Sequence, residues 1–135
     1  MTRVPDALRR TVYGRAEGKC EYCLLHERYT VKRHHIDHIT AEKHGGATDI
    51  TNLCLSCAAC NHYKGSDLTS IDPVTGKVIQ LFHPRKDRWH QHFRFEGALI
   101  QGITARGRVT VRLLHLNDED SVNERTRLME LGAYP

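Results

Sequence analysis

Two Cys-x-x-Cys pairs constrain the fold of this chain more than any other feature of its sequence. Cys20 and Cys23 form the first pair, and Cys57 and Cys60 form the second. A two-residue spacing is typical of zinc knuckles, and four thiolates complete the closed tetrahedral shell of a structural Zn²⁺ site. The interval between the pairs is longer than in a short zinc finger, so we expect a strand and a loop to lie between them. Such an ion would clamp the N-terminal segment against the start of a later helix and supply much of the folding free energy.

The remaining thiol and a nearby histidine leave other interpretations to weigh. Five cysteines are an odd number, and reducing conditions keep thiols free, so a disulfide framework is not expected. Redox chemistry or unrelated thiols are the alternatives to zinc, and the two matched pairs favour zinc. Cys54 is left over and is expected to be a small buried hydrophobic residue. His26, three residues after Cys23, is a weaker candidate ligand.

Length and composition predict one folded domain over residues 1–135. The chain is long enough for a single modest core, and its 39% hydrophobic and 27% charged residues are typical of globular proteins. The formal net charge of +4 permits DNA binding without proving it. Residues 1–10 lack the apolar segment of a signal peptide, and no run is long enough to span a bilayer. We therefore expect a cytoplasmic protein without a membrane partner.

Residues 34–64 concentrate the side chains that bind metals or transfer protons. Polar and apolar residues alternate over residues 35–39, which predicts a short strand whose end presents Asp37 and His38. Neighbours on a strand face opposite sides, although a bend at the strand end could bring both to one site. A Gly-Gly turn, a second short strand and a helix are expected to follow, over residues 45–46, 52–55 and 57–64.

The residue types in this stretch suit the hydrolysis of a phosphodiester bond. Imidazole has a reference pKa of about 6.5, so a neutral histidine can accept a proton near neutral pH. Carboxylate and amide oxygens are hard ligands that leave most coordination positions of a Mg²⁺-like ion to water and phosphate. Such an ion stabilises the charge that develops on phosphorus and on the leaving oxygen.

The same stretch resembles the HNH endonucleases of the ββα-metal, or His-Me finger, group. Several independent motifs match in the family's order, whereas a lone Asp-His pair would mean little. The matching residues are Asp37-His38-Ile39, Gly45-Gly46, Asn52-Leu53 and Cys57-x-x-Cys60-Asn61-x-x-Lys64.

This resemblance implies a role for each matched polar residue. His38 would be the general base that takes a proton from water, and Asp37 with Asn61 would hold one divalent cation, Mg²⁺ or Mn²⁺. Asn52 would steady the loop that orients His38. The family often has histidine at the last of these positions, where this chain has Asn61 followed by His62, and the choice between the two as ligand stays open.

Four basic residues are predicted to contact nucleic acid. Lys64 belongs to the matched motif, and Arg85, Lys86 and Arg88 form the densest basic cluster outside residues 34–64. Arginine and lysine suit phosphate contacts, which fix the position of a protein on DNA without reading its sequence. The aromatic residue beside this cluster, Trp89, is expected to pack in the core.

The rest of the chain predicts an α+β fold. Periodicity predicts helices over residues 7–17 and 121–131 and strands over residues 77–82, 92–95 and 108–116. The last helix is expected to begin with a capping box of Ser121 and Glu124. Residues 81–85, 89–93 and 107–108 resemble the C-terminal extension of a bacterial HNH subgroup. We therefore expect a zinc-stapled ββα core over about residues 18–66, a short β-rich extension over about residues 67–135, and terminal helices.

Two further hypotheses come from other functional classes. The chain could be a catalytically inactive, zinc-stabilised module that binds DNA or RNA, or an adaptor that binds protein. The complete set of Asp37, His38, Asn52 and Asn61 argues against both, because binding alone does not need these side chains together. The sequence therefore favours a metal-dependent DNA endonuclease.

Overall fold

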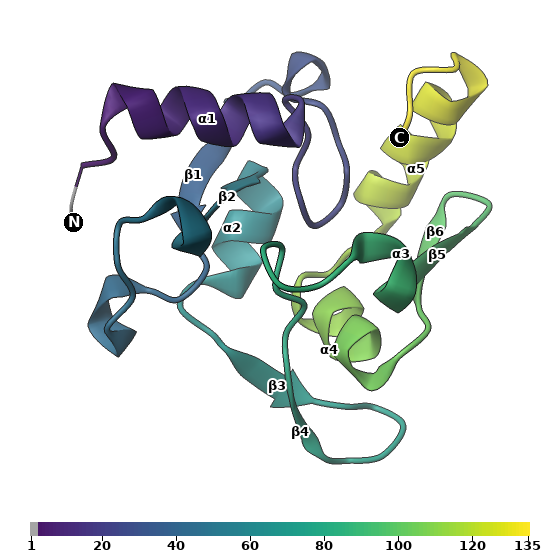
Figure 1. Ribbon diagram of the computed structural model, residues 1–135. Helices are drawn as coiled ribbons and strands as arrows, with labels where there is room; N and C mark the ends of the chain where they lie inside the picture. Colours follow the sequence, from purple (N-terminus) through teal and green to yellow (C-terminus); the bar gives the residue numbers. More distant parts are fainter. Residues whose placement is uncertain (1–2) are drawn as a thin grey trace.

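The computed structural model describes residues 3–135, and in that part of the chain helices alternate with short antiparallel hairpins (Figure 1). Residues 1 and 2, the start of the predicted domain, lie outside the described residues. The helices are α1 (Asp6–Ala16), α2 (Ala58–Lys64), α3 (Trp89–His92), α4 (Ala105–Leu113) and α5 (Glu119–Glu130). The paired strands are β1 (His35–His38) with β2 (Leu53–Ser56), β3 (Thr69–Ile71) with β4 (Val78–Gln80), and β5 (Phe93–Glu96) with β6 (Leu99–Gly102). The predicted α+β class is confirmed.

The β1–β2 hairpin separates two helices that pack on its opposite faces. Its register pairs Asp37 with Cys54 and His38 with Leu53. Because side chains alternate along a strand, Leu53 and its neighbours on that face pack against Val12 of α1. The other face, which carries Asp37, lies toward α2, so strand, strand and helix follow one another as the sequence predicts.

Arg15 and Glu21, which precede β1 in the chain, protect the outer edge of β2. The guanidinium of Arg15 donates to the carbonyl oxygens of Ile50 and Leu53. Glu21 completes the edge, since its N–H donates to Leu55 O and its carboxylate accepts from Leu55 N, both at 2.8 Å. An exposed strand edge invites pairing with other chains, and these contacts remove that possibility.

The C-terminal region packs against the segment that carries the first cysteine pair. Trp89 Nε1 donates to Tyr22 O at 2.9 Å, and the Tyr134 hydroxyl donates to Cys23 O. Phe93 and Ile100 are fully buried in the same hydrophobic cluster as the cysteines. The zinc-knuckle segment and the C-terminal extension therefore share one core.

The predicted strand over residues 108–116 is wrong, because this segment forms helix α4. The Thr104 side chain caps the helix by accepting from Gly107 N at 3.0 Å. Gly107 lies directly against the backbone of His92, where a Cβ would overlap the His92 carbonyl oxygen. Capping and close packing outweigh the β preference of the alternating Val and Thr residues. The extension is accordingly a mixture of helices and hairpins.

Other boundaries differ in detail. The helix predicted over residues 7–17 is confirmed as α1, and α2 ends before Gly65 as expected. Helix α5 begins earlier than predicted, because Asp118 is the cap and accepts from Ser121 N at 2.8 Å. Ser121 is therefore inside the helix. No helix within residues 3–135 has the length and apolar character needed to cross a bilayer.

Candidate active site and zinc centre

The four predicted zinc ligands come together in the folded chain. Their sulfur atoms all lie within 4.8 Å of one another, and all four side chains are buried. The Sγ atoms of Cys23 and Cys57 are 3.8 Å apart. A zinc–sulfur bond of about 2.3 Å places the sulfurs of a tetrahedron about 3.8 Å apart, so the cluster fits a structural Zn²⁺ ion.

The backbone and the charge of this cluster also suit zinc. In each pair the second N–H donates to the first sulfur, from Cys23 N to Cys20 Sγ at 3.5 Å and from Cys60 N to Cys57 Sγ at 3.4 Å. The hydrogen bonds among these thiols hold the pKa of Cys57 well below its usual range and raise the pKa values of Cys23 and Cys60, so Cys57 is the thiol that carries the negative charge. The thiolate is the form that binds zinc.

The two other candidate ligands lie outside the cluster. Cys54 is fully buried, its thiol donates to the Tyr22 hydroxyl at 3.8 Å, and burial raises its pKa. It therefore acts as the small buried residue that the sequence predicts. His26 caps a 3₁₀ turn instead, with Nδ1 accepting from Arg28 N at 3.0 Å.

His38 lies at the end of β1, where the following loop holds its ring. Its Nε2 is 2.8 Å from Thr48 Oγ1 and 4.0 Å from Glu42 Oε1. The side chain is 12% exposed, so the ring is partly shielded and still reachable from solvent. Nothing in the sequence marked Thr48 as a residue that would contact His38.

Asn52 ties together the two ends of the loop that follows His38. Its Oδ1 accepts from Thr40 N, and its Nδ2 donates to Thr40 O and Ala47 O, all at 2.9 Å. Gly46 permits this closure, because a Cβ there would overlap the Thr40 carbonyl oxygen. The loop that carries Thr48 is therefore fixed by a side chain from its far end.

Asp37 has an unsatisfied buried oxygen. Its Oδ2 is buried, accepts no hydrogen bond in the described part of the chain, and lies 3.6 Å from the Lys64 ammonium. Burial raises the pKa of the Asp37 carboxyl, while the nearby Lys64, His38 and His35 oppose that rise. The ammonium compensates the carboxylate at ion-pair distance and leaves this oxygen without a hydrogen bond, so the oxygen is available to a ligand.

The two alternative metal ligands on α2 have different surroundings. Asn61 is partly buried and lies one turn before Lys64, whose ammonium nitrogen is 3.6 Å from Asp37 Oδ2. His62 is exposed, and its ring packs edge to face against Tyr63, with centroids 5.3 Å apart. Residues three apart share a helix face, so Asn61 lies on the same side of α2 as Lys64.

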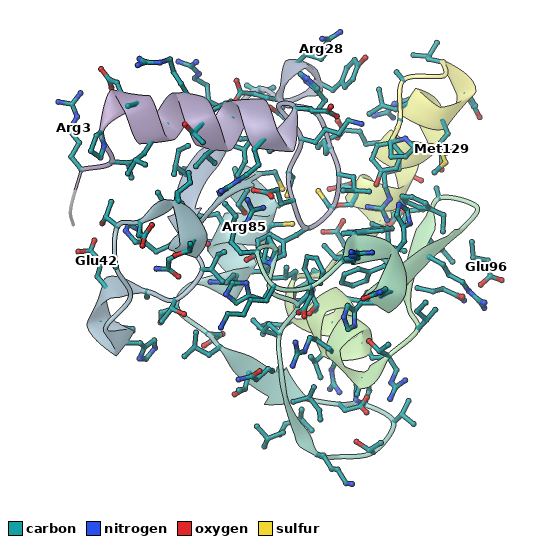
Figure 2. The ribbon with its side chains drawn as sticks, viewed as in Figure 1. Arg3, Arg28, Glu42, Arg85, Glu96 and Met129 are labelled. Carbon is teal, nitrogen blue, oxygen red and sulfur yellow. The ribbon has the colours of Figure 1, made fainter. Side chains whose placement is uncertain are left out.

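Two of the four residues predicted to contact phosphate point into the protein. The Lys64 side chain is only 2% exposed, and its ammonium donates to Ile39 O at 3.0 Å. Arg85 lies at the middle of the molecule in Figure 2, where its guanidinium pairs with Glu21, and burial lowers its pKa to about 10. The prediction of phosphate contacts is therefore corrected for Lys64 and Arg85, because both charges are used by internal partners.

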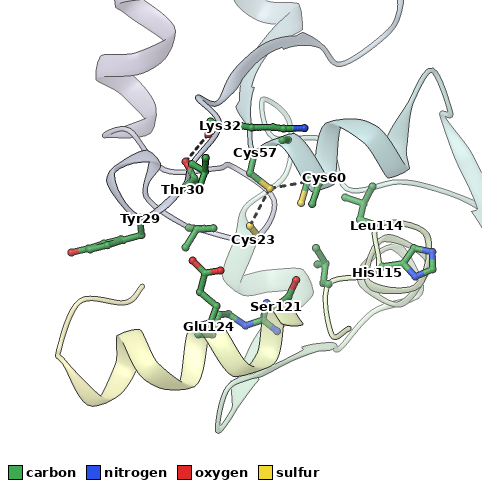
Figure 3. Close-up of a pocket in the computed structure, with 16 residues that line it drawn as sticks. Cys23, Tyr29, Thr30, Lys32, Cys57, Cys60, Leu114, His115, Ser121 and Glu124 are labelled. Atoms are coloured by element: carbon green, nitrogen blue, oxygen red, sulfur yellow. Dashed lines mark hydrogen bonds between the residues drawn. The ribbon is translucent and has the colours of Figure 1, made fainter. Parts of the chain in front are cut away.

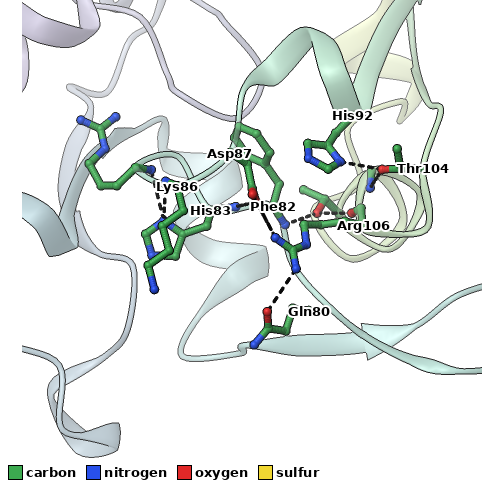
Figure 4. Close-up of polar contacts among 11 residues, drawn as sticks. Gln80, Phe82, His83, Lys86, Asp87, His92, Thr104 and Arg106 are labelled. Atoms are coloured by element: carbon green, nitrogen blue, oxygen red, sulfur yellow. Dashed lines mark hydrogen bonds and ion pairs between the residues drawn. The ribbon is translucent and has the colours of Figure 1, made fainter.

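The other two basic residues, Lys86 and Arg88, are exposed on a loop with a fixed shape. Asp87 accepts from His83 N and from the Arg106 guanidinium, each at 2.9 Å (Figure 4). Burial alone would raise the pKa of Asp87, but these hydrogen bonds produce a net decrease. The loop therefore holds Lys86 and Arg88 outward.

A cavity of about 410 Å³ borders the cysteine cluster. In Figure 3, Cys23 and Cys57 form one wall, and Ser121 and Glu124 of α5 face them. Most of the remaining lining is apolar. Since neither Asp37 nor His38 lines it, the cavity is separate from the candidate active site.

Residues 20–67 match the family model described as HNH endonuclease. This match begins at the first cysteine of the cluster and extends past Lys64, so it contains both cysteine pairs and the loop closed by Asn52. No curated protein and no solved structure matches the chain.

Proposed function

Since residues 20–67 of this chain form an HNH endonuclease domain, we propose that the protein hydrolyses phosphodiester bonds in DNA with the help of a divalent cation. The observation that carries this proposal is the buried Oδ2 of Asp37, which accepts no hydrogen bond and belongs to the residue before His38 in β1. Most buried acceptors in folded proteins receive a hydrogen bond, so this oxygen is a candidate metal ligand although the Lys64 ammonium lies 3.6 Å away. The family match concerns the domain, and the proposal adds that this chain has a catalytic activity.

The donor set fits a hard cation such as Mg²⁺ or Mn²⁺. Asp37 offers a carboxylate oxygen, and Asn61 offers an amide oxygen from the same side of α2 as Lys64. The exposed position of His62 beside Tyr63 favours Asn61 as the second ligand. A cation bound there would stabilise negative charge on the phosphate and on the departing 3′ oxygen.

The proton is accepted by His38. Thr48 holds the ring through Nε2, and Asn52 holds the loop that carries Thr48. The imidazole is therefore oriented before DNA binds, and it takes a proton from the water that attacks phosphorus in line with the scissile bond. General-base catalysis of this kind contributes about 10²–10⁴-fold to a rate.

DNA is held by the exposed basic loop. Lys86 and Arg88 project into solvent, and the bonds of Asp87 keep the loop in one shape. Contacts from such residues to phosphate fix the register of the duplex. The five cysteines of the protein, all buried and none in a disulfide, suit a protein that acts in the reducing cytoplasm.

Cleavage of supercoiled plasmid with Mg²⁺ or Mn²⁺ tests this function. We expect His38→Ala to lower the rate by about 10³-fold while zinc content and circular dichroism stay unchanged. His44→Ala is the matched control, because His44 lies exposed in the same loop, in the 3₁₀ turn Glu42–His44.

The variants separate catalysis from binding. Wild-type protein and His44→Ala should both cut, and EDTA should stop both. A folded, zinc-loaded His38→Ala protein with full activity would overturn the role of His38. A wild-type protein that binds DNA but leaves every substrate intact would instead be a zinc-stabilised binding module.

A further inference from the structure

The Lys64 ammonium contacts the residues on both sides of His38. It donates to Ile39 O at 3.0 Å and lies 3.6 Å from Asp37 Oδ2. Lys64 is the last residue of α2, and Asp37 belongs to β1. One buried side chain therefore joins the catalytic helix to the strand that carries the proposed base and the proposed metal ligand.

The charges of Lys64 and Asp37 give this contact an electrostatic role in addition to its mechanical one. The side chains of Lys64 and Asp37 are 2% and 16% exposed, so their charges act on each other with little screening by solvent. Without the lysine, the Asp37 carboxylate would be a buried charge with no compensating cation, which is strongly destabilising. When a divalent cation binds the same carboxylate, the ammonium and the metal repel each other.

We propose that Lys64 is a positioning residue that compensates Asp37 in the metal-free protein and weakens the binding of a divalent cation at that carboxylate. This inference rests on the proposed function, because it takes Asp37 as a metal ligand. The lysine keeps the site formed before the metal arrives, and it sets the metal concentration at which the site fills. Lys64 thereby acts on the cation, in place of the phosphate contact that the sequence predicts.

A purely mechanical role for Lys64 makes the opposite prediction. If the lysine only tied α2 to Ile39 O, its removal would loosen the site and weaken metal binding. If its charge competes with the metal, removal of that charge strengthens metal binding. The sign of the change in affinity therefore separates the two roles.

The test is Mn²⁺ binding to zinc-loaded protein, followed by the electron paramagnetic resonance signal of free Mn²⁺. We expect Lys64→Met and Lys64→Gln to bind Mn²⁺ about ten-fold more tightly than wild type, since a nearby like charge has been removed. Lys64→Gln also keeps a donor for Ile39 O. Lys77→Met is the control, because Lys77 is exposed in the turn before β4, and its affinity should equal that of wild type.

Asp37→Asn distinguishes a failure of this inference from a failure of the proposed function. It should abolish the tight Mn²⁺ site in the wild-type background and in the Lys64→Met background. Equal binding by wild type and Asp37→Asn would overturn the metal site itself, and the role of Lys64 with it. Loss of binding in Asp37→Asn, with unchanged or weaker binding in both lysine variants, would overturn only the role of Lys64.

Poor folding of the lysine variants is also informative. Compensation by Lys64 predicts that an unstable variant refolds when Mn²⁺ is added, at concentrations below those that stabilise wild type, because the metal replaces the missing charge. Thermal unfolding with increasing Mn²⁺ measures this effect. A variant that stays unfolded in excess Mn²⁺ would assign Lys64 a mechanical role and contradict the proposal.

Discussion

Two aspartates, the buried Asp72 and the partly buried Asp37, show how the same residue type serves stability and chemistry. Asp72 accepts hydrogen bonds from Val74 N, from the Thr75 hydroxyl and from both arms of the Arg108 guanidinium. Asp37, in contrast, has a buried oxygen that accepts no hydrogen bond within residues 3–135 and lies at ion-pair distance, 3.6 Å, from the Lys64 ammonium. The difference in donors separates a structural carboxylate from one that is available to a ligand.

The pKa values follow the same division. Hydrogen bonds from Arg108 hold the pKa of Asp72 well below its usual range, whereas burial raises the pKa of Asp37. Asp72 joins the β3–β4 turn to α4, so its charge stabilises the C-terminal region. The N-terminal half depends instead on the cysteine cluster, and the two halves should respond differently to metal and to acid.

Loss of zinc should have the largest effect. Cys57→Ala removes one ligand, and apparent zinc-binding free energies in zinc-finger peptides are about 10 kcal/mol or more. We expect the variant to lose zinc and cooperative unfolding, including that of the extension, because Trp89 and Tyr134 pack against the knuckle. Zinc analysis and circular dichroism measure this.

Cys54→Ala provides the matched control for that experiment, since Cys54 is buried but lies outside the cluster. It should keep one equivalent of zinc and a cooperative transition. A Cys57→Ala protein that retains both would contradict the proposed zinc centre.

Acid should act on the second half through Asp72. A carboxylate whose pKa is lowered by folding contributes stability that is complete above its unfolded pKa of about 3.9 and is lost as the pH falls toward the folded value. We therefore expect the melting temperature of wild type to fall below about pH 4, and to fall less steeply in Asp72→Asn. Thermal unfolding from pH 6 to pH 2 tests this, and identical slopes for the two proteins would contradict it.

The smallest effect is expected at the exposed basic loop. Lys86→Ala and Arg88→Ala should each lower the affinity for DNA only several-fold, and each should reduce the slope of log affinity against log salt by about one. Fluorescence anisotropy in the His38→Ala background measures binding without cleavage.

Arg85→Ala should instead lower the stability of the protein, because Arg85 pairs with Glu21 inside it. A normal melting temperature for this variant would contradict that assignment.

The features predicted correctly from the sequence are those set by local spacing. The pairs Cys20–Cys23 and Cys57–Cys60 indicated the four-cysteine cluster, which the structure forms, because metal-ligand geometry fixes a two-residue interval. Alternation before Thr40 and the Gly65 stop indicated β1 and α2 for similarly local reasons.

The features predicted wrongly depend on partners that are far away in the chain. Lys64 looked like a surface cation because nothing local shows that Asp37 and Ile39 would surround it. Arg85 depends on Glu21, a partner from a different element. Residues 108–116 alternate like a strand, and the helix is imposed by the Thr104 cap and by contact with His92.

The most direct test of the account compares wild type with Asp37→Asn in plasmid cleavage, using zinc-loaded protein, with Mg²⁺ and with EDTA. The account predicts that wild-type protein cuts only with the added cation, and that Asp37→Asn keeps its fold and its zinc but cuts at least about 10²-fold more slowly. Equal cleavage by the two proteins, or cleavage that continues in EDTA, would contradict the claim that Asp37 holds a catalytic cation beside His38.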